Sequence, residues 1–216
     1  MLTDPNPASD THSRDHWWTR PGWGPHTQWY TVHATFGAQP GTAVLHTHAE
    51  RWRPLLDRPG WDLIPLRWLH LTMQGVGDVE LVPRGQVERL TAALRRAVGG
   101  TGTARVELGP VAVDAEGINL PAHGEGAAAL DRVRDGVRTA IGQVLGEEAV
   151  EEGPRWRPHV SLAYAHTTGA PLGPVREELA ARTEPVQVGI DHLDLIALRR
   201  QGHLYRWEEI ARLPLC

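Results

Sequence analysis

The spacing of apolar side chains changes between two periods along the first half of the chain. Residues 29–36 alternate in polarity and are β-branched or aromatic, and residues 63–75 have a similar character, so a strand is predicted at each. Residues 42–57 and 85–100 instead repeat apolar side chains every three or four positions, which predicts two amphipathic helices. Pro54 should kink or shorten the first helix, because proline lacks the N–H that continues the ladder.

A similar order of elements returns after residue 103. The pattern predicts two strands joined by a turn at 104–120, a helix at 128–146, a strand at 155–165, a helix at 171–183, and two antiparallel strands at 186–200 and 203–215 with their turn at Gln201-Gly202.

Each half is therefore predicted as strand, helix, histidine-bearing strand and helix. The histidines of the two matching strands, His70 and His159, lie 89 residues apart (159 − 70). We expect an α+β fold in which a duplicated unit forms two lobes, approximately 28–103 and 104–216. Antiparallel sheets should flank a central cleft, with the helices outside.

Residues 1–27 differ from the rest of the chain. They are rich in Pro, Gly, Asp, Ser and His and show no periodicity, which is typical of an irregular arm. The arm carries Trp17, Trp18 and Trp23. Because indole rings favour contact with apolar surface, we expect part of the arm to dock onto the domain rather than extend into solvent.

The two histidine strands carry matching tetrapeptides. His-Leu-Thr-Met begins at His70, and His-Val-Ser-Leu begins at His159. Residues two apart share a face of a strand, so Thr72 should point with the first histidine and Ser161 with the second. If the two lobes are related by a pseudo-twofold axis, both polar faces meet across the cleft, and two imidazoles and two hydroxyls surround one small volume.

That set of groups suits cleavage of a phosphodiester. Attack on phosphorus needs a general base on one side and a general acid at the leaving oxygen, and histidine titrates in the range that allows both roles. The hydroxyls of Thr72 and Ser161 can donate to the non-bridging oxygens, where negative charge gathers. Because the motifs contain no carboxylate, we expect neither a metal nor another cofactor at this site.

Composition limits which partners and which cellular location we expect for the protein. The net charge of −4 and the pI of about 6.3 do not favour tight binding to long nucleic acid, but they allow a small anionic substrate. The one cysteine, Cys216, excludes an intramolecular disulfide. There is no signal-peptide pattern, and no apolar run approaches the roughly 20 residues of a membrane span. We expect a monomeric cytoplasmic protein with no membrane partner.

Over residues 29–215 the chain resembles the 2H phosphoesterase superfamily, most closely its 2′-5′ RNA ligase-like and cyclic phosphodiesterase group. The resemblance is carried by residues 158–162, Pro-His-Val-Ser-Leu, and by residues 68–73, Trp-Leu-His-Leu-Thr-Met, which Gly75 and Gly77 follow. It implies an acid and base pair, His70 and His159, and phosphate-binding hydroxyls on Thr72 and Ser161. The expected substrates are 2′,3′-cyclic nucleotides, ADP-ribose cyclic phosphate or RNA ends, turned over without a metal or nucleotide cofactor.

Two further side chains are candidates for substrate binding. His33 begins a third His-x-Thr-apolar stretch outside the 89-residue repeat, and it would contact substrate if its face of the strand lines the cleft. Arg157, together with Arg155, should share the face of His159 and supply positive charge to a phosphate.

Other residues are set aside on geometric grounds. Tyr164 should point away from His159 in a regular strand. His46 and His48 resemble a metal pair, but side chains two apart on a helix diverge. Cys216, as the last residue of this sequence, lacks a held geometry for a nucleophile.

Three alternatives remain open from the sequence. The same fold can bind RNA or a nucleotide without turnover, although such a module has no need for two titrating histidines. The 12 histidines also leave open the alternative that the protein is a metallohydrolase, since histidine is a common metal ligand. The same acid and base can run 2′-5′ RNA ligation as the reverse reaction, and the sequence does not separate ligase from hydrolase.

Overall fold

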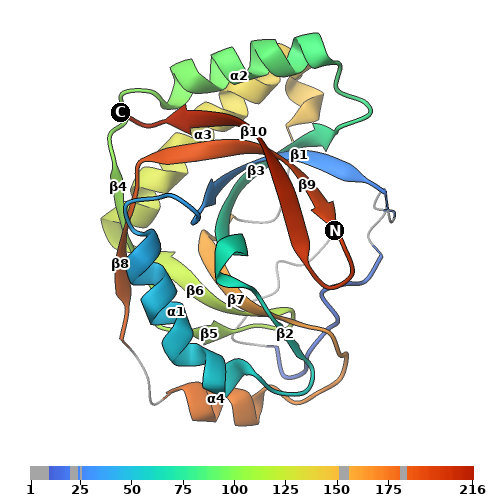
Figure 1. The fold of residues 1–216 in the computed structure, drawn as a ribbon, viewed down its shortest axis with the longest axis vertical. Helices are drawn as coiled ribbons and strands as arrows, with labels where there is room; N and C mark the ends of the chain where they lie inside the picture. The colour runs from blue at the N-terminus through green and yellow to red at the C-terminus, as the bar shows by residue number, and fades with distance from the viewer. Residues whose placement is uncertain (1–9, 20–23, 25, 151–155, 181–183) are drawn as a thin grey trace.

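A computed structural model describes residues 10–19, 24, 26–150, 156–180 and 184–216, and these form two antiparallel sheets and four α-helices (Figure 1). The first elements are β1 Gln28–Thr35, α1 Thr42–Leu56, β2 Trp61–Leu63, β3 His70–Asp78, α2 Arg84–Val98, β4 Ala104–Leu108, β5 Ala112–Val113 and β6 Gly117–His123. They continue with α3 Gly124–Leu145, β7 His159–Ala165, α4 Gly173–Ala180, β8 Val186–Ile190, β9 His192–Arg200 and β10 Tyr205–Pro214. Short 3₁₀ turns occupy Leu66–Trp68 and Glu147–Ala149.

The sheets exchange strands between the two halves of the chain. The four-stranded sheet has the order β10-β9-β1-β3, and the other has the order β2-β7-β6-β4-β8, with β5 paired to β6. Thus β2, from the first half of the chain, joins the sheet of the second half, while β9 returns to pair with β1 and β10 pairs with β9 (Figure 1). A boundary near residue 103 therefore does not separate the sheets, because the partner of a strand depends on tertiary packing that the polarity pattern does not contain.

The duplication itself is visible in the element order. β3 and β7 begin at His70 and His159, 89 residues apart, and α2 and α4 begin at Arg84 and Gly173 with the same offset. Antiparallel pairing also repeats, since β1 pairs with β3 as β6 pairs with β7. The predicted class, an α+β fold with duplicated antiparallel sheets, is confirmed.

The start of α3 shows where the polarity pattern was incomplete. The helix begins at Gly124 rather than near residue 128, directly after β6. A Cβ on Gly126 would lie 2.3 Å from the carbonyl oxygen of Arg105, so only glycine lets the first turn approach β4 this closely. Because glycine is a poor helix former, helix propensity alone predicts that α3 begins later in the chain than it does.

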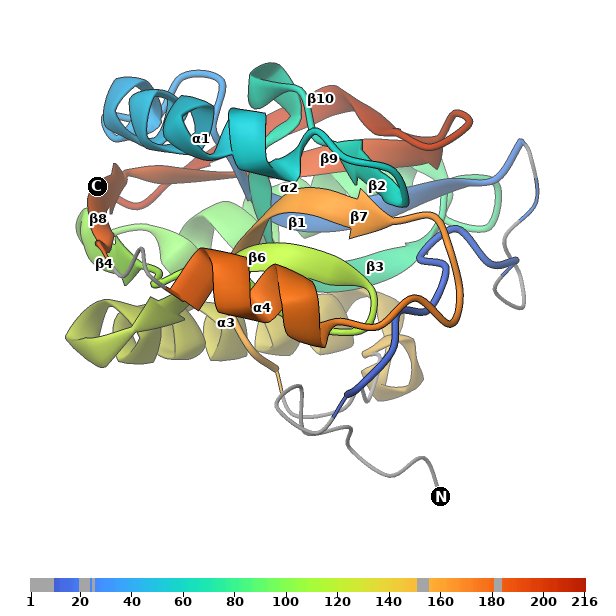
Figure 2. The ribbon, with the colours of Figure 1, turned by 90° about the horizontal axis from the view of Figure 1, so that it is seen from below.

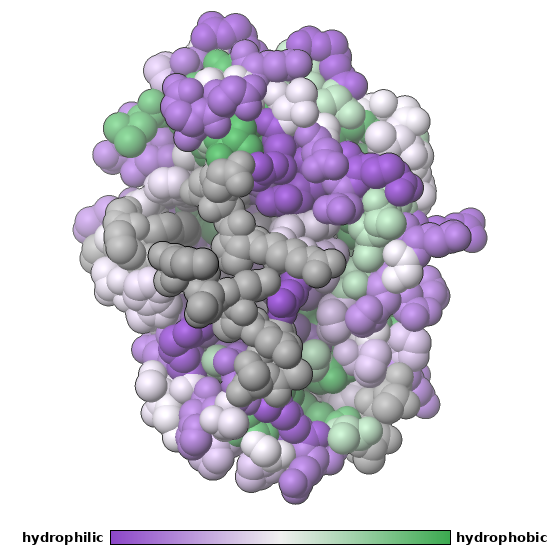
Figure 3. Space-filling model, turned by 180° about the vertical axis from the view of Figure 1, so that it is seen from behind, coloured by the Kyte–Doolittle hydropathy of each residue, from purple (hydrophilic) through white to green (hydrophobic). Residues whose placement is uncertain are grey.

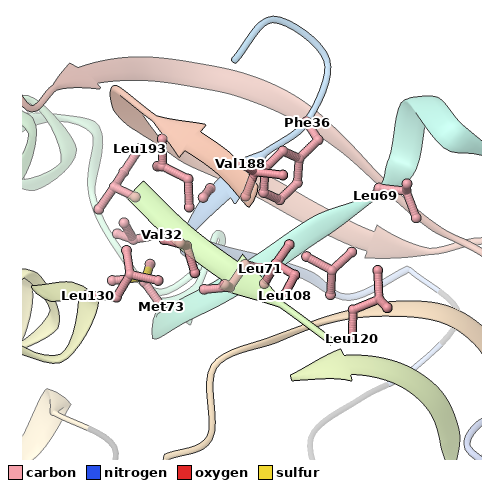
Figure 4. Close-up of a cluster of buried hydrophobic side chains, with 14 of the residues drawn as sticks. Val32, Phe36, Leu69, Leu71, Met73, Leu108, Leu120, Leu130, Val188 and Leu193 are labelled. Atoms are coloured by element: carbon pink, nitrogen blue, oxygen red, sulfur yellow. The ribbon is translucent and has the colours of Figure 1, made fainter. Parts of the chain in front are cut away.

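Both motifs contribute their apolar residues to one continuous core. Leu71, Met73, Val160 and Leu162 are buried, as expected for the faces opposite the polar ones. Figure 4 shows residues from both sheets and from α3 meeting in this core: Val32, Leu71, Leu108, Leu120, Val188 and Leu130. Burying one such side chain stabilises the fold by about 1.5–3 kcal/mol, so the core strongly favours this arrangement of the strands.

Figure 3 shows the face of the molecule opposite to the one seen in Figure 1. This face is mostly polar, with hydrophilic side chains around small apolar patches. Within the described part of the chain, no helix has the length and apolar character needed to cross a membrane.

Part of the arm docks onto the domain. Trp17 is 6% exposed, and its indole Nε1–H donates to Asp62 Oδ2 at 2.8 Å. Its carbonyl accepts a hydrogen bond of 2.7 Å from Arg200, which holds the arm against the end of β9. Trp18 is 45% exposed, and Trp23 lies outside the described residues.

Replacing Trp17 by alanine should therefore destabilise the whole domain. Phe or Trp truncation in a packed site costs about 3–5 kcal/mol, and Trp17→Ala should lower the free energy of unfolding by about 3 kcal/mol. Trp18→Ala, at a neighbouring exposed position, should change it by less than about 1 kcal/mol. Urea denaturation of both variants measures the difference, and equal small effects would show that the arm does not contribute to the core.

Candidate active site

The fold brings the two histidine strands into contact. β3 and β7 pack against each other, and the indole Nε1–H of Trp156, just before β7, donates to the carbonyl oxygen of Thr72 at 3.0 Å. A positive charge on His159 lowers the pKa of His70, which places the two rings within electrostatic reach. Motifs far apart in the sequence thus share one region.

Each motif histidine is held by the same hydrogen bond. The Nδ1 of His70 lies 2.8 Å from the carbonyl oxygen of Trp68, and the Nδ1 of His159 lies 2.8 Å from that of Arg157. A carbonyl oxygen only accepts, so Nδ1 carries the hydrogen in both neutral rings. Both histidines therefore keep Nε2 as the nitrogen that can accept or deliver a proton.

The two histidines differ in their surroundings. His70 is 9% exposed, whereas His159 is exposed to solvent. Burial lowers the pKa of His70 to about 4; the hydrogen bond to Trp68 opposes this shift, and positive charge on His159 or His16 adds to it. His70 is therefore neutral near pH 7, and the duplicated motifs are chemically unequal.

Aromatic rings account for the burial of His70. His33 is 1% exposed and stacks on His70 with ring centroids 4.8 Å apart and ring planes 9° apart. Trp207 of β10 meets His70 edge-on with centroids 5.3 Å apart. Burial, followed by the charge of His70, holds the pKa of His33 well below its usual value. The structure thus places His33 against the first motif histidine and away from solvent.

Ser161 is tied into a chain of hydrogen bonds that sequence reasoning missed. Its hydroxyl donates to Asn119 Oδ1 at 2.7 Å, and Asn119 Nδ2 donates to Asp114 Oδ2 at 2.7 Å. Asp114 also accepts from the backbone N–H groups of Glu116 and Gly117. Since a carboxylate only accepts, Asp114 sets the orientation of the amide, and the Ser161 hydrogen points at Asn119.

Burial also changes the titration of the carboxylate in this chain. It raises the pKa of Asp114, while the two backbone N–H groups and the charge of His159 act in the opposite direction. A carboxylate therefore lies within electrostatic reach of His159, although neither motif contains one. The polarity pattern gave no signal for these two residues, because Asn119 lies on the neighbouring strand β6 and Asp114 lies in the turn between β5 and β6, outside both histidine strands.

The remaining predicted residues lie at the exposed edge of this region. Thr72 is exposed, and it pairs with His33 across β3 and β1. Arg157 is exposed too, and its carbonyl is the group that holds His159. Arg155 lies outside the described residues.

A β-bulge brings Tyr164 to the same face as Ser161. Across β6 and β7, Asn119 pairs with Ser161 but Ile118 pairs with Ala163, so Leu162 is an extra residue in β7. The bulge shifts the alternation of side chains by one position. Our expectation that Tyr164 points away was wrong, because it assumed a regular strand.

The docked arm adds a histidine beside this tyrosine. The His16 ring stacks on Tyr164 with centroids 3.9 Å apart, and its Nε2 lies 3.1 Å from the hydroxyl of Tyr205. Positive charge on His16 also contributes to the lowered pKa of His70, after burial and the charge of His159. No periodicity marks residue 16, so only the folded arm reveals its position.

The arrangement therefore supplies groups suited to proton transfer and to hydrogen bonding with an anion. It offers two imidazole Nε2 atoms, and the Ser161 hydroxyl becomes a donor once it turns from Asn119. Within the described ranges, neither His70 nor His159 belongs to a group of three side chains that could hold a metal ion.

Comparisons with known proteins identify a family and a similar fold. The sequence model of the 2′-5′ RNA ligase superfamily matches residues 40–202. The fold is similar to the crystal structure of TT0787 from Thermus thermophilus, with a TM-score of 0.64 and 18% identity over 87% of this chain and 97% of that one. It is also similar to Escherichia coli LigT solved with 3′-AMP, with a TM-score of 0.62 and 14% identity over 88% and 99% of the two chains. No curated protein sequence matches the chain.

The buried histidines should make stability fall as the pH is lowered from 7 to 4. In the folded protein His70 stays neutral down to a pKa of about 4, whereas in the unfolded chain it takes up a proton near its ordinary value of 6.5. Below 6.5 the unfolded state binds more protons, so this contribution is complete above 6.5 and is lost as the pH falls. The loss attributable to His70 is about 3 kcal/mol at pH 4.

Urea denaturation at a series of pH values checks this effect. His70→Gln should give a shallower dependence of the unfolding free energy on pH than the parent protein. His123→Gln, which changes an exposed histidine, should retain the parental slope. Identical slopes for the parent protein and His70→Gln would contradict the assignment.

Proposed function

The chain belongs to the 2′-5′ RNA ligase superfamily, and from this premise we propose that it is a metal-independent phosphoesterase. Its substrates are 2′,3′-cyclic phosphates or related phosphodiesters of nucleotides or RNA ends. The observation that carries the proposal is the pair of motif histidines, His70 and His159, on contacting strands, each tethered through Nδ1 so that Nε2 is left for proton transfer.

The unequal environments suggest a role for each histidine. Burial keeps His70 neutral, so its Nε2 can remove a proton from the attacking water. The water oxygen then bonds to phosphorus as the bond to the leaving oxygen breaks. The exposed His159 remains solvated when protonated, and it donates its proton to that leaving oxygen. The two histidines exchange protonation states, and solvent restores them.

The hydroxyls complete the proposed site. Ser161 turns its hydrogen from Asn119 to a non-bridging oxygen, and Thr72 donates from the opposite strand. In this proposal His33 acts as a positioning residue, because its stacked ring helps to bury His70. Arg157 supplies positive charge to the outer part of the substrate.

A nucleotide is the favoured substrate class on two grounds. The structurally similar LigT has been solved with 3′-AMP, and separately with ATP and with NADP⁺. The acid and base pair suits a cyclic phosphate, in which the leaving oxygen stays attached to the product and the protons move over a short distance.

The description of the superfamily favours 2′-5′ RNA ligation as a second candidate. Ligation uses the same two histidines with a different nucleophile, since the 5′ hydroxyl of one RNA, in place of water, attacks the cyclic phosphate of another and the P–O bond of the ring breaks. The two reactions differ in the group that accepts the phosphoryl group. Water yields a phosphomonoester, and an RNA hydroxyl yields a 2′-5′ linkage.

Removal of either motif histidine should abolish most turnover. His70→Ala and His159→Ala should each lower kcat on 2′,3′-cyclic nucleotides by about two to four orders of magnitude. The double variant should lose much less than the product of the two effects, because the residues act as a unit. His123→Ala is the matched control at an exposed position. A folded single variant with near-parental kcat would refute the paired mechanism.

The dependence of rate on pH should be bell-shaped. Because catalysis needs one neutral and one protonated histidine, kcat/KM should fall at both extremes, with two macroscopic pKa values that belong to the pair. The acidic limb should lie well below 6.5, since burial lowers the pKa of His70 to about 4.

Assays on cyclic nucleotides and on 2′-5′-linked RNA, with a strong chelator present, test this profile. Analysis of the product shows which hydroxyl keeps the phosphate and so names the leaving oxygen. A profile with a single ionisation, or activity that requires added metal, would exclude the proposed mechanism.

A further inference from the structure

Three side chains outside the active site converge at one end of the two sheets. Asp62 comes from β2, His166 follows β7, and His203 lies in the turn between β9 and β10. Figure 2 shows this turn and the ends of β2 and β7 on the same side of the molecule. One ligand atom from each residue lies within 4.8 Å of the other two. We propose that these residues bind a divalent transition-metal ion, with Zn²⁺ as the best match.

The local geometry favours a metal over simple hydrogen bonding. Nδ1 of His166 lies 3.0 Å from Asp62 Oδ1, and Nδ1 of His203 lies 2.9 Å from Asp62 Oδ2. Yet the buried Nδ1 of His166 has no hydrogen-bond partner in the described structure, so the ring does not aim at the nearby oxygen. In a tetrahedral zinc site the ligand atoms lie about 3.3 Å apart and aim at the ion between them.

The chemistry of the donor set points to the same ions. Neutral imidazole and carboxylate are common zinc ligands, and three protein ligands leave a fourth position for water. All three side chains are partly exposed, which gives the ion a path from solvent.

Trp17 supports the site from outside. Its Nε1–H donates to Asp62 Oδ2 at 2.8 Å, and its ring stacks on His203 with centroids 5.4 Å apart and planes 2° apart. Such outer contacts orient the ligands of metal sites. The docked arm therefore holds two of the three side chains in place.

The position of the site indicates a structural role. Asp62 lies in the sheet that contains β7 and His166 directly follows β7, while His203 lies in the turn that joins two strands of the other sheet. A bound ion would cross-link the sheets and hold the arm between them. His166 is seven residues beyond His159, about 20 Å along an extended strand, so the ion is separate from the motif histidines.

Calorimetric titration of chelator-treated protein with Zn²⁺ tests the proposal. The parent protein should bind one Zn²⁺ per chain, and its Tm should rise when the ion is added. Asp62→Asn, His166→Ala and His203→Ala should each weaken the affinity at least about tenfold and abolish the rise in Tm. His123→Ala, at an exposed histidine, should bind Zn²⁺ as the parent does.

Two features of the design separate loss of a ligand from loss of the fold. Asp62→Asn keeps a carbonyl oxygen for the indole of Trp17, and far-ultraviolet circular dichroism confirms folding of every variant. Absence of saturable binding by the parent protein would overturn the proposal. So would binding that survives in all three variants, or binding that is lost in His70→Ala or His159→Ala instead. None of these measurements uses catalytic activity, so they leave the phosphoesterase proposal to its own assays.

Discussion

The shared apolar core is the constraint on which the rest of this structure depends. Leu71 and Val160 are buried beside the motif histidines, and each fixes which face of its strand can carry polar groups. Because both apolar faces enter one core, β3 and β7 are held in contact. The polar faces then meet without any strong direct attraction between the histidines, which would repel each other if both were charged.

Duplication supplies two similar motifs, and packing makes them different. The Nδ1 hydrogen bonds repeat with the same length, so the orientation of His70 matches that of His159. The stacked ring of His33 and the edge of Trp207 bury only the first of them. Desolvation disfavours the charged form of the buried ring, so a near-symmetric scaffold holds one motif histidine buried with a lowered pKa and the other exposed.

The N-terminal arm links the candidate active site to the opposite end of the sheets. His16 stacks on Tyr164, whose direction depends on the bulge in β7, and the next residue, Trp17, contacts Asp62. Consecutive residues of the arm therefore contact the edge of the candidate active site and the proposed metal site. Movement of the arm would change the surroundings of both, although neither sequence motif lies within it.

The sequence alone determined the features that follow from local periodicity. The 89-residue repeat, the type of most elements and the common face of His70 with Thr72 come from the spacing of polar and apolar positions, since side chains alternate regularly along a strand. The pattern did not resolve the strand expected at 63–75 into the end of β2, a 3₁₀ turn and β3, nor the two strands expected at 104–120 into β4, β5 and β6. Tertiary structure decided what periodicity does not encode. The exchange of β2, β9 and β10 between sheets depends on long-range pairing, and a bulge reversed the expected direction of Tyr164. The low pKa of His70 likewise arises only when rings distant in the chain exclude water from it, because desolvation is a property of the packed environment and not of the residue type.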